Sequence, residues 1–103
     1  MENKLPSDVD LSVVVPVYNE EENIEPFLAR LEPVLDKLGV NYEILFILDP
    51  SRDNTEQIIV DNIKRNSGIS LITMTRRWGQ NACLAAGIEN CQGEACVTID
   101  VDL

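Results

Sequence analysis

Four short apolar runs alternate with longer segments of mixed polarity along the chain. The runs are rich in valine, isoleucine and leucine, which is typical of strands buried on both faces of a parallel sheet. They predict strands at residues 11–15, 42–48, 69–74 and 95–99. The segments between them carry apolar residues at helical spacing. The alternation therefore predicts an α/β domain with a mostly parallel sheet, flanking helices and right-handed crossovers.

The helix expected after the first strand has a recognisable start and end. Asn19 precedes a run of acidic residues, and both features suit the positively charged N-terminus of a helix. Gly39 is a typical C-terminal stop, because glycine adopts the left-handed backbone that closes many helices. Pro33 lies between them and lacks the N–H that a helix interior needs. We therefore expect this helix to be kinked or interrupted at Pro33.

Two further helices are expected. Asp53 marks the start of the second helix, and residues 66–68 mark its end. The third helix spans residues 81–90, and its apolar face is expected to hold Leu84, Ala85 and Ile88.

The composition is that of one globular domain. The chain has 103 residues, of which 45% are hydrophobic and 25% are charged, and this suffices for one modest core. Residues 1–10 are polar and acidic, so we expect a tail there and not a secretory signal. No apolar run approaches the roughly 20 residues that a membrane-spanning helix needs. Because the chain stops directly after the last predicted strand, we expect residues 11–103 to be part of a larger domain.

The charge and the absent histidine exclude several functions. Eight Lys and Arg against eighteen Asp and Glu give a net charge of −10, which argues against nucleic acid or an anionic membrane surface as this segment's own partner. A phosphorylated ligand would need positive charge supplied locally, for which a divalent metal is the obvious source. Without histidine, these residues alone cannot build a Ser-His-Asp or Cys-His enzyme.

The three cysteines indicate a reducing, cytoplasmic compartment. Cys83, Cys91 and Cys96 are odd in number and contain no Cys-x-x-Cys pair. This pattern disfavours a disulfide framework or a zinc site. We expect all three to be small buried side chains.

Functional groups follow each predicted strand. Residues 16–20, Asp49, residues 76–78 and residues 100–102 come directly after the four apolar runs. Ligands of parallel α/β sheets bind beyond the carboxyl ends of the strands. The topology would therefore gather these residues along one edge of the sheet.

The Asp100-Val101-Asp102 triplet suggests a metal site. Residues two apart in a strand point to the same side, so the two carboxylates would face one way. Such a pair suits Mg²⁺ or Mn²⁺, which complete their shells with substrate phosphates. The triplet also fits an ordinary polar strand end. Neither a Gly-x-Gly-x-x-Gly nor a Walker pattern is present, which excludes the standard dinucleotide and P-loop sites.

The residues after the third run leave two interpretations open. Arg76 and Arg77 could bind phosphate or form a solvated pair, and Trp78 could stack on a ligand or close the edge of the core.

Taken together, these motifs resemble the N-terminal, nucleotide-binding half of family-2 glycosyltransferases. The resemblance covers residues 11–103 and is nearest to the branch that glycosylates polyprenyl or dolichyl phosphate. It implies a Rossmann-like half of a glycosyltransferase A-type fold, truncated after the Asp-x-Asp motif. The motifs that carry it are residues 15–20, 49–55, 76–80, 85–87 and 100–103.

The resemblance also implies ligands and residue roles. The donor would be a UDP- or GDP-linked sugar, transferred with inversion to a polyprenyl or dolichyl phosphate or a cell-surface glycan. Mg²⁺ or Mn²⁺ would be held by Asp102 directly and by Asp100 as a second ligand. The catalytic residues would lie in the absent acceptor half, and the full-length protein would lie at the cytoplasmic face of a membrane. The residues implied to bind the donor are Pro16, Tyr18, Glu20, Ile47, Asp49, Asp100, Val101 and Asp102.

Two departures from the family pattern keep an alternative open. The loop at residues 48–51 reads Leu-Asp-Pro-Ser where the family usually has Asp-Asp-Gly-Ser, and residues 77–80 read Arg-Trp-Gly-Gln where relatives often have Asn-Phe-Gly-Lys. The alternative is a non-catalytic nucleotide-binding or scaffolding domain of the same ancestry. A flavodoxin-like signalling domain would need an acidic cluster at the end of the first strand and a phosphoacceptor at the end of the third. It is disfavoured, because these ends read Pro-Val-Tyr at residues 16–18 and Thr-Arg-Arg at residues 75–77. We expect the chain alone to bind donor weakly, to transfer no sugar, and to self-associate through an unpaired sheet edge.

Overall fold

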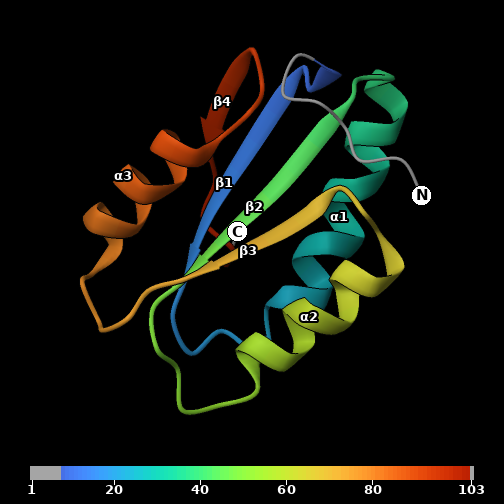
Figure 1. Ribbon diagram of the computed structural model, residues 1–103. Coiled ribbons are helices and arrows are strands. Elements are labelled where there is room, and N and C mark those ends of the chain that lie inside the picture. The colour runs from blue at the N-terminus through green and yellow to red at the C-terminus, as the bar shows by residue number, and fades with distance from the viewer. Residues whose placement is uncertain (1–7, 103) are drawn as a thin grey trace.

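The computed structural model describes residues 8–102, which form a parallel sheet with helices on both faces (Figure 1). The strands are ordered β3-β2-β1-β4. From β1 the chain adds β2 and then β3 on one side, and it then crosses over to add β4 on the other side of β1. The carboxyl ends of β1 and β4 therefore flank the topological switch point. In chain order the elements are β1 (Leu11–Val17), α1 (Ile24–Leu38), β2 (Tyr42–Leu48), α2 (Thr55–Arg65), β3 (Ile69–Thr73), α3 (Gln80–Asn90) and β4 (Ala95–Thr98).

The predicted strand and helix order is confirmed, with small shifts at the strand ends. β1 extends two residues beyond the prediction and includes Pro16, while β3 and β4 each end one residue early. Proline is tolerated because β4 pairs with β1 only as far as Val14. The carbonyl of Val14 accepts from the Ile99 N–H on that side. Pro16 faces the same side two residues later, where β1 has no paired strand, so its missing N–H costs no ladder bond.

The predicted start of the first helix was wrong, and the helix is not interrupted at Pro33. α1 begins at Ile24 with Asn23 as its cap, and not at Asn19. Asn19 has a positive φ of 51° and belongs to the preceding turn. Pro33 does not interrupt α1, because Pro33 lies on the exposed side, where water can satisfy the carbonyl it leaves free.

Two apolar layers cover the sheet. α1 and α2 pack on one face, where the ring centroids of Phe27 and Phe46 lie 6.2 Å apart in an edge-on arrangement. α3 packs on the other face through Cys83 and Gly87. Of the face predicted for α3, Leu84 is partly buried and packs against this core, but the prediction was wrong for Ile88, which is 54% exposed. Ala85 is exposed as well.

The N-terminal tail predicted for residues 1–10 is wrong for residues 9 and 10. Val9 is buried, and the Asp10 N–H donates to the carbonyl of Asn41. The carbonyl of Val9 accepts from Glu94, so residues 9–10 belong to the fold because they carry backbone hydrogen bonds on both sides of β1. Residues 1–7 of that predicted tail, and Leu103 of the last motif, lie outside the described residues.

Only one of the three cysteines is buried as predicted. Cys83 is buried as expected, but Cys91 is only partly buried and Cys96 is exposed on β4.

All four side chains of β4 are exposed at that edge of the sheet, and self-association there stays a prediction. Within residues 8–102, the structure contains no helix with the length and apolar character needed to cross a membrane.

A buried carboxylate fastens the α3–β4 connection to the sheet. Glu43 of β2 accepts hydrogen bonds of 2.6 Å from the Ser12 hydroxyl and 2.6 Å from the Gln92 N–H. The Ser12 oxygen in turn accepts from the Gly93 N–H at 2.8 Å. This network holds the start of β4 against β1.

Replacing Glu43 with alanine should destabilise the fold. The change leaves the buried Ser12 hydroxyl without its acceptor, which costs about 1–3 kcal/mol, and it also removes the acceptor of the part-buried Gln92 N–H. Urea unfolding should therefore show a clear loss for Glu43→Ala, and a smaller loss for Glu43→Gln, which keeps an acceptor oxygen. Equal stability of Glu43→Ala and the wild type would contradict the role assigned to this network.

Candidate functional site

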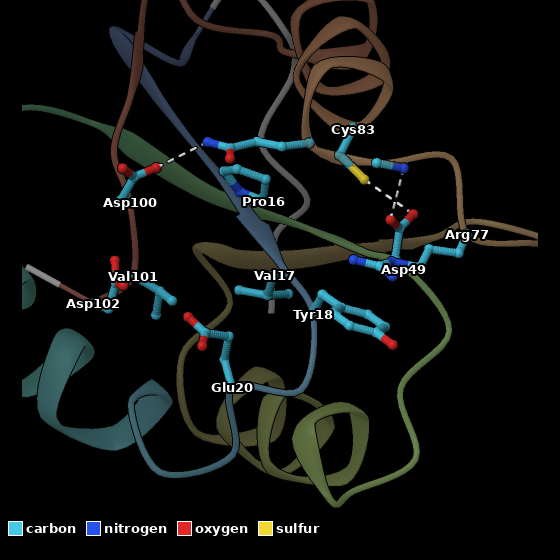
Figure 2. A pocket seen from close by; sticks show the side chains of 12 residues that line it. Pro16, Val17, Tyr18, Glu20, Asp49, Arg77, Cys83, Asp100, Val101 and Asp102 are labelled. Carbon is cyan, nitrogen blue, oxygen red and sulfur yellow. Dashed lines mark hydrogen bonds between the residues drawn. The ribbon is translucent and has the colours of Figure 1, made fainter.

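An open pocket of about 270 Å³ lies at the carboxyl ends of β1 and β4, at the switch point of the sheet (Figure 2). Strand ends of β1, β2 and β4 contribute to it, together with the β3–α3 loop and the first turn of α3. Its lining residues are Pro16, Val17, Tyr18, Glu20, Asp49, Arg77, Gly79, Gln80, Cys83, Asp100, Val101 and Asp102.

Seven of the eight residues assigned to donor binding from the sequence line this pocket. The exception is Ile47, whose fully buried side chain packs with Val14, Leu45 and Cys83 under α3. An apolar strand residue is drawn into the core, so the structure does not bring it to the pocket. The seven lining residues are Pro16, Tyr18, Glu20, Asp49, Asp100, Val101 and Asp102.

The assignments from the sequence missed five lining residues: Arg77, Gly79, Gln80, Cys83 and Val17. The first three belong to a motif that the sequence had singled out, but no individual role pointed to them. Cys83 gave no signal beyond its position one turn into the helix that follows this motif.

Hydrogen bonds between two loops position the residues after β1. The Asn19 N–H donates to Ser51 Oγ at 2.9 Å, and the Glu20 N–H donates to Thr55 Oγ1 at 2.9 Å. Asn19 Oδ1 accepts from the Arg52 N–H at 3.0 Å. The loop after β2 thus fixes the backbone that carries Tyr18 and Glu20 into the pocket.

Asp49 anchors the wall formed by the β3–α3 loop and α3. Its carboxylate is 2% exposed. It accepts from the backbone N–H groups of Gly79 at 3.0 Å and Trp78 at 3.4 Å, and from the Cys83 thiol at 3.2 Å. A carboxylate at this position also suits the positive N-terminus of α3.

Cys83 acts as a donor here and not as a nucleophile. Burial, and after it the hydrogen bond to the Asp49 carboxylate, raise the pKa of its thiol to about 12. A thiol with this pKa stays protonated at neutral pH, so it holds Asp49 in place instead of reacting.

The opposite end of the pocket is acidic. Asp100 and Asp102 both line it, although β4 ends at Thr98 and residues 101–102 form a turn. The alternation expected of an extended strand is therefore wrong here, yet Val101 is still buried in the core at 5% exposure. Asp100 accepts from Gln80 Nε2 at 3.2 Å (Figure 2).

The Glu20 carboxylate completes this acidic end. Its pKa is raised, first by burial and then by the negative charge of Asp102, with smaller contributions from Asp53 and Asp100. These neighbouring charges favour a cation. Oxygen ligands of this kind suit Mg²⁺ or Mn²⁺. No group of three acidic, cysteine or histidine side chains within residues 8–102 is close enough to hold a metal ion alone, so a ligand would have to complete the shell.

The raised pKa of Glu20 predicts a pH-dependent effect on stability. The pKa of this carboxyl is higher in the folded state than in the unfolded state, so its ionised form destabilises the fold. The cost in free energy grows as pH rises from the pKa of the unfolded state through that of the folded state. In EDTA-containing buffer, Glu20→Gln should therefore be more stable than the wild type at pH 7, and the difference should shrink toward pH 4. Urea unfolding at both pH values checks this, and a difference independent of pH would contradict it.

The chain is similar to known proteins over most of its length. Residues 12–103 match the family described as "Glycosyl transferase family 2". The chain is 41% identical over 95 residues to an uncharacterized glycosyltransferase of Synechocystis sp., covering 92% of this chain and 30% of that protein. It is 37% identical over 94 residues to an undecaprenyl-phosphate 4-deoxy-4-formamido-L-arabinose transferase of Pseudomonas fluorescens, covering 90% of this chain and 28% of that protein.

A solved structure is also similar. The mannosyltransferase PcManGT from Pyrobaculum calidifontis, in complex with GDP-Man and Mn²⁺, superposes with a TM-score of 0.77 at 25% identity. The match covers 94% of this chain and 29% of that one. The chain thus spans about 30% of the length of the relatives it matches.

Proposed function

Because the chain belongs to glycosyl transferase family 2, we propose that its pocket binds the nucleoside-diphosphate sugar from which a larger enzyme transfers the sugar. The family resemblance and the glycosyltransferase A-type fold expected from the sequence are confirmed. The observation that carries the donor assignment is the pocket at the switch point, with a buried carboxylate at one end and an acidic group at the other.

The acidic end suits the diphosphate and its metal. Asp102 would hold Mg²⁺ or Mn²⁺ directly and Asp100 would be the second ligand, while Glu20 adds negative charge beside them. When bound, such a metal neutralises charge on the departing nucleoside diphosphate. The similar mannosyltransferase that binds GDP-Man and Mn²⁺ supports this choice of ligands.

The other lining residues would position the nucleoside. Tyr18 is 36% exposed and lines the pocket, with Pro16 before it at the end of β1. Val101 would contribute its backbone, since its side chain is buried. Asp49 would shape the far end through the loop that it anchors.

The acceptor that we propose is a polyprenyl phosphate. An acceptor phosphate oxygen would attack the anomeric carbon from the face opposite the nucleoside diphosphate, forming one C–O bond while the bond to the diphosphate breaks. A phosphate monoester has a second pKa near 6, so it is largely ionised at neutral pH and needs little help from a general base. The undecaprenyl-phosphate transferase among the relatives supports this acceptor, and the whole protein would then work at the cytoplasmic face of a membrane.

Calorimetry tests the donor assignment. GDP, UDP and their sugars are titrated into the chain with Mn²⁺ and again with EDTA. We expect weak binding that requires the metal, and no sugar transfer by the chain alone. A folded chain that binds none of these ligands would contradict the proposal.

A non-catalytic domain is the second candidate. Leu48 stands where the family usually has a carboxylate, and its side chain is 2% exposed within the core. Such a domain would bind nucleotide without transfer. Sugar transfer by the longer protein, and its loss in Asp102→Ala, would exclude this candidate.

A further inference from the structure

Arg77 is the one basic side chain among the residues that line the pocket. Four carboxylates, those of Glu20, Asp49, Asp100 and Asp102, line the same space. Arg77 stands where related sequences often have asparagine, so its charge is a departure from the family pattern and is not explained by it.

The Arg77 guanidinium contacts an aromatic ring and forms no ion pair with a carboxylate of residues 8–102. Its central carbon lies 4.0 Å from the centre of the Tyr18 ring. The ion pair that the structure records within residues 8–102 joins other residues, Arg65 and Glu32. Within residues 8–102 the Arg77 N–H donors have no hydrogen-bond acceptor. These donors lie in the plane of the guanidinium, so contact with a ring face does not use them.

The position of Arg77 assigns it to one end of the ligand. Figure 2 shows Arg77, Tyr18 and Asp49 together at one end, with Asp100 and Asp102 at the other. If the metal and the diphosphate occupy the acidic end, then the nucleoside extends toward Arg77. The Asp49 carboxylate at this end has about four acceptor positions. Three of them accept from Trp78, Gly79 and Cys83, so about one acceptor position is left.

We infer that Arg77 reads the nucleobase of the donor by donating hydrogen bonds to a ring carbonyl oxygen. Uracil O4 and guanine O6 are acceptors, whereas cytosine and adenine present an amino donor at the same position. Arg77 therefore selects the two carbonyl-bearing bases and rejects the two amino-bearing ones. This inference rests on the proposed function, because it requires a nucleotide in the pocket.

Arg76 supplies a matched control. Its guanidinium carbon also lies over an aromatic ring, 3.9 Å from the centre of Trp78, yet Arg76 does not line the pocket. Arg76→Gln and Arg77→Gln remove the same charge and the same kind of stacking from adjacent positions. Arg77→Lys keeps the charge and loses the planar donor edge.

The test measures dissociation constants for GDP, UDP, ADP, CDP and inorganic pyrophosphate, each with Mn²⁺. The wild type and Arg76→Gln should prefer GDP and UDP over ADP and CDP by roughly tenfold or more. Arg77→Gln should reduce this preference to about threefold or less and leave pyrophosphate binding unchanged, with Arg77→Lys between the two. Circular dichroism verifies that each variant is folded.

Three results would overturn the inference. In the first, Arg77→Gln weakens pyrophosphate as much as the nucleotides, which would assign Arg77 to phosphate. In the second, the base preference is unchanged in Arg77→Gln or is absent from the wild type. The third is different in kind: a folded wild type that binds no nucleotide with Mn²⁺ would overturn the proposed function together with this inference.

Discussion

Asp102→Asn is expected to weaken Mn²⁺-dependent GDP or UDP binding by at least about 100-fold. Loss of a group that only orients a metal ligand typically costs 10–100-fold, and Asp102 is proposed to contact the metal directly. The amide keeps the shape of the side chain but removes the negative charge, which is the property that the metal requires. Calorimetry with Mn²⁺, repeated with EDTA, measures the effect.

The control for this variant is Asp36→Asn. Both aspartates are exposed, and Asp36 lies near the end of α1, away from the residues that line the pocket. Neither change should alter the free energy of unfolding by more than about 0.5 kcal/mol, as is usual for surface substitutions. Binding by Asp102→Asn that equals that of Asp36→Asn would contradict the assignment of Asp102 as a metal ligand.

Gly87→Ala should destabilise the fold by about 1–3 kcal/mol, the usual range for overpacking a core. A Cβ at this position would lie 2.3 Å from Val14 Cγ1 and 3.2 Å from Ile47 Cγ1. Both neighbours are fully buried β-branched residues with little freedom to turn away. α3 would have to move off the sheet, and the pocket wall that it carries would move with it.

The sign of this effect is informative. In an exposed helix, replacing glycine with alanine stabilises by about 1 kcal/mol through helix propensity. Ala85→Gly, on the exposed face of the same helix, should therefore be destabilising by a similar amount. Urea unfolding of both variants checks these expectations. A more stable Gly87→Ala would show that α3 does not pack on the sheet through this glycine.

The sequence predicted the layers of the fold well because its apolar runs are short and strongly patterned. It failed where a tertiary contact overrides a local preference. Asn19 has the chemistry of a helix cap, yet its side chain accepts from the Arg52 N–H and its backbone turns with a positive φ. The buried face of α3 was also misassigned at Ala85 and Ile88, because periodicity counts large apolar side chains and ignores the small Gly87.

The candidate site was predictable where residues follow a strand end. Topology alone gathers Tyr18, Asp49 and Asp102 at one edge, and they do line one pocket. Arg77 and Cys83 were not predictable as lining residues, because their positions depend on the path of the β3–α3 loop. That path is fixed by hydrogen bonds to Asp49 across about thirty residues of sequence, which a local pattern does not reveal.

Paramagnetic broadening by Mn²⁺ is the most direct test of the central claim that this pocket holds a metal-bound nucleoside diphosphate. Substoichiometric Mn²⁺ is added to the ¹⁵N-labelled chain in the presence of GDP or UDP, and the loss of each amide signal is recorded. We expect the broadening to centre on residues 18–20 and 100–102. Broadening centred elsewhere, for example on the exposed residues Glu56 and Asp61 of α2, or broadening that the nucleotide does not change, would contradict the claim.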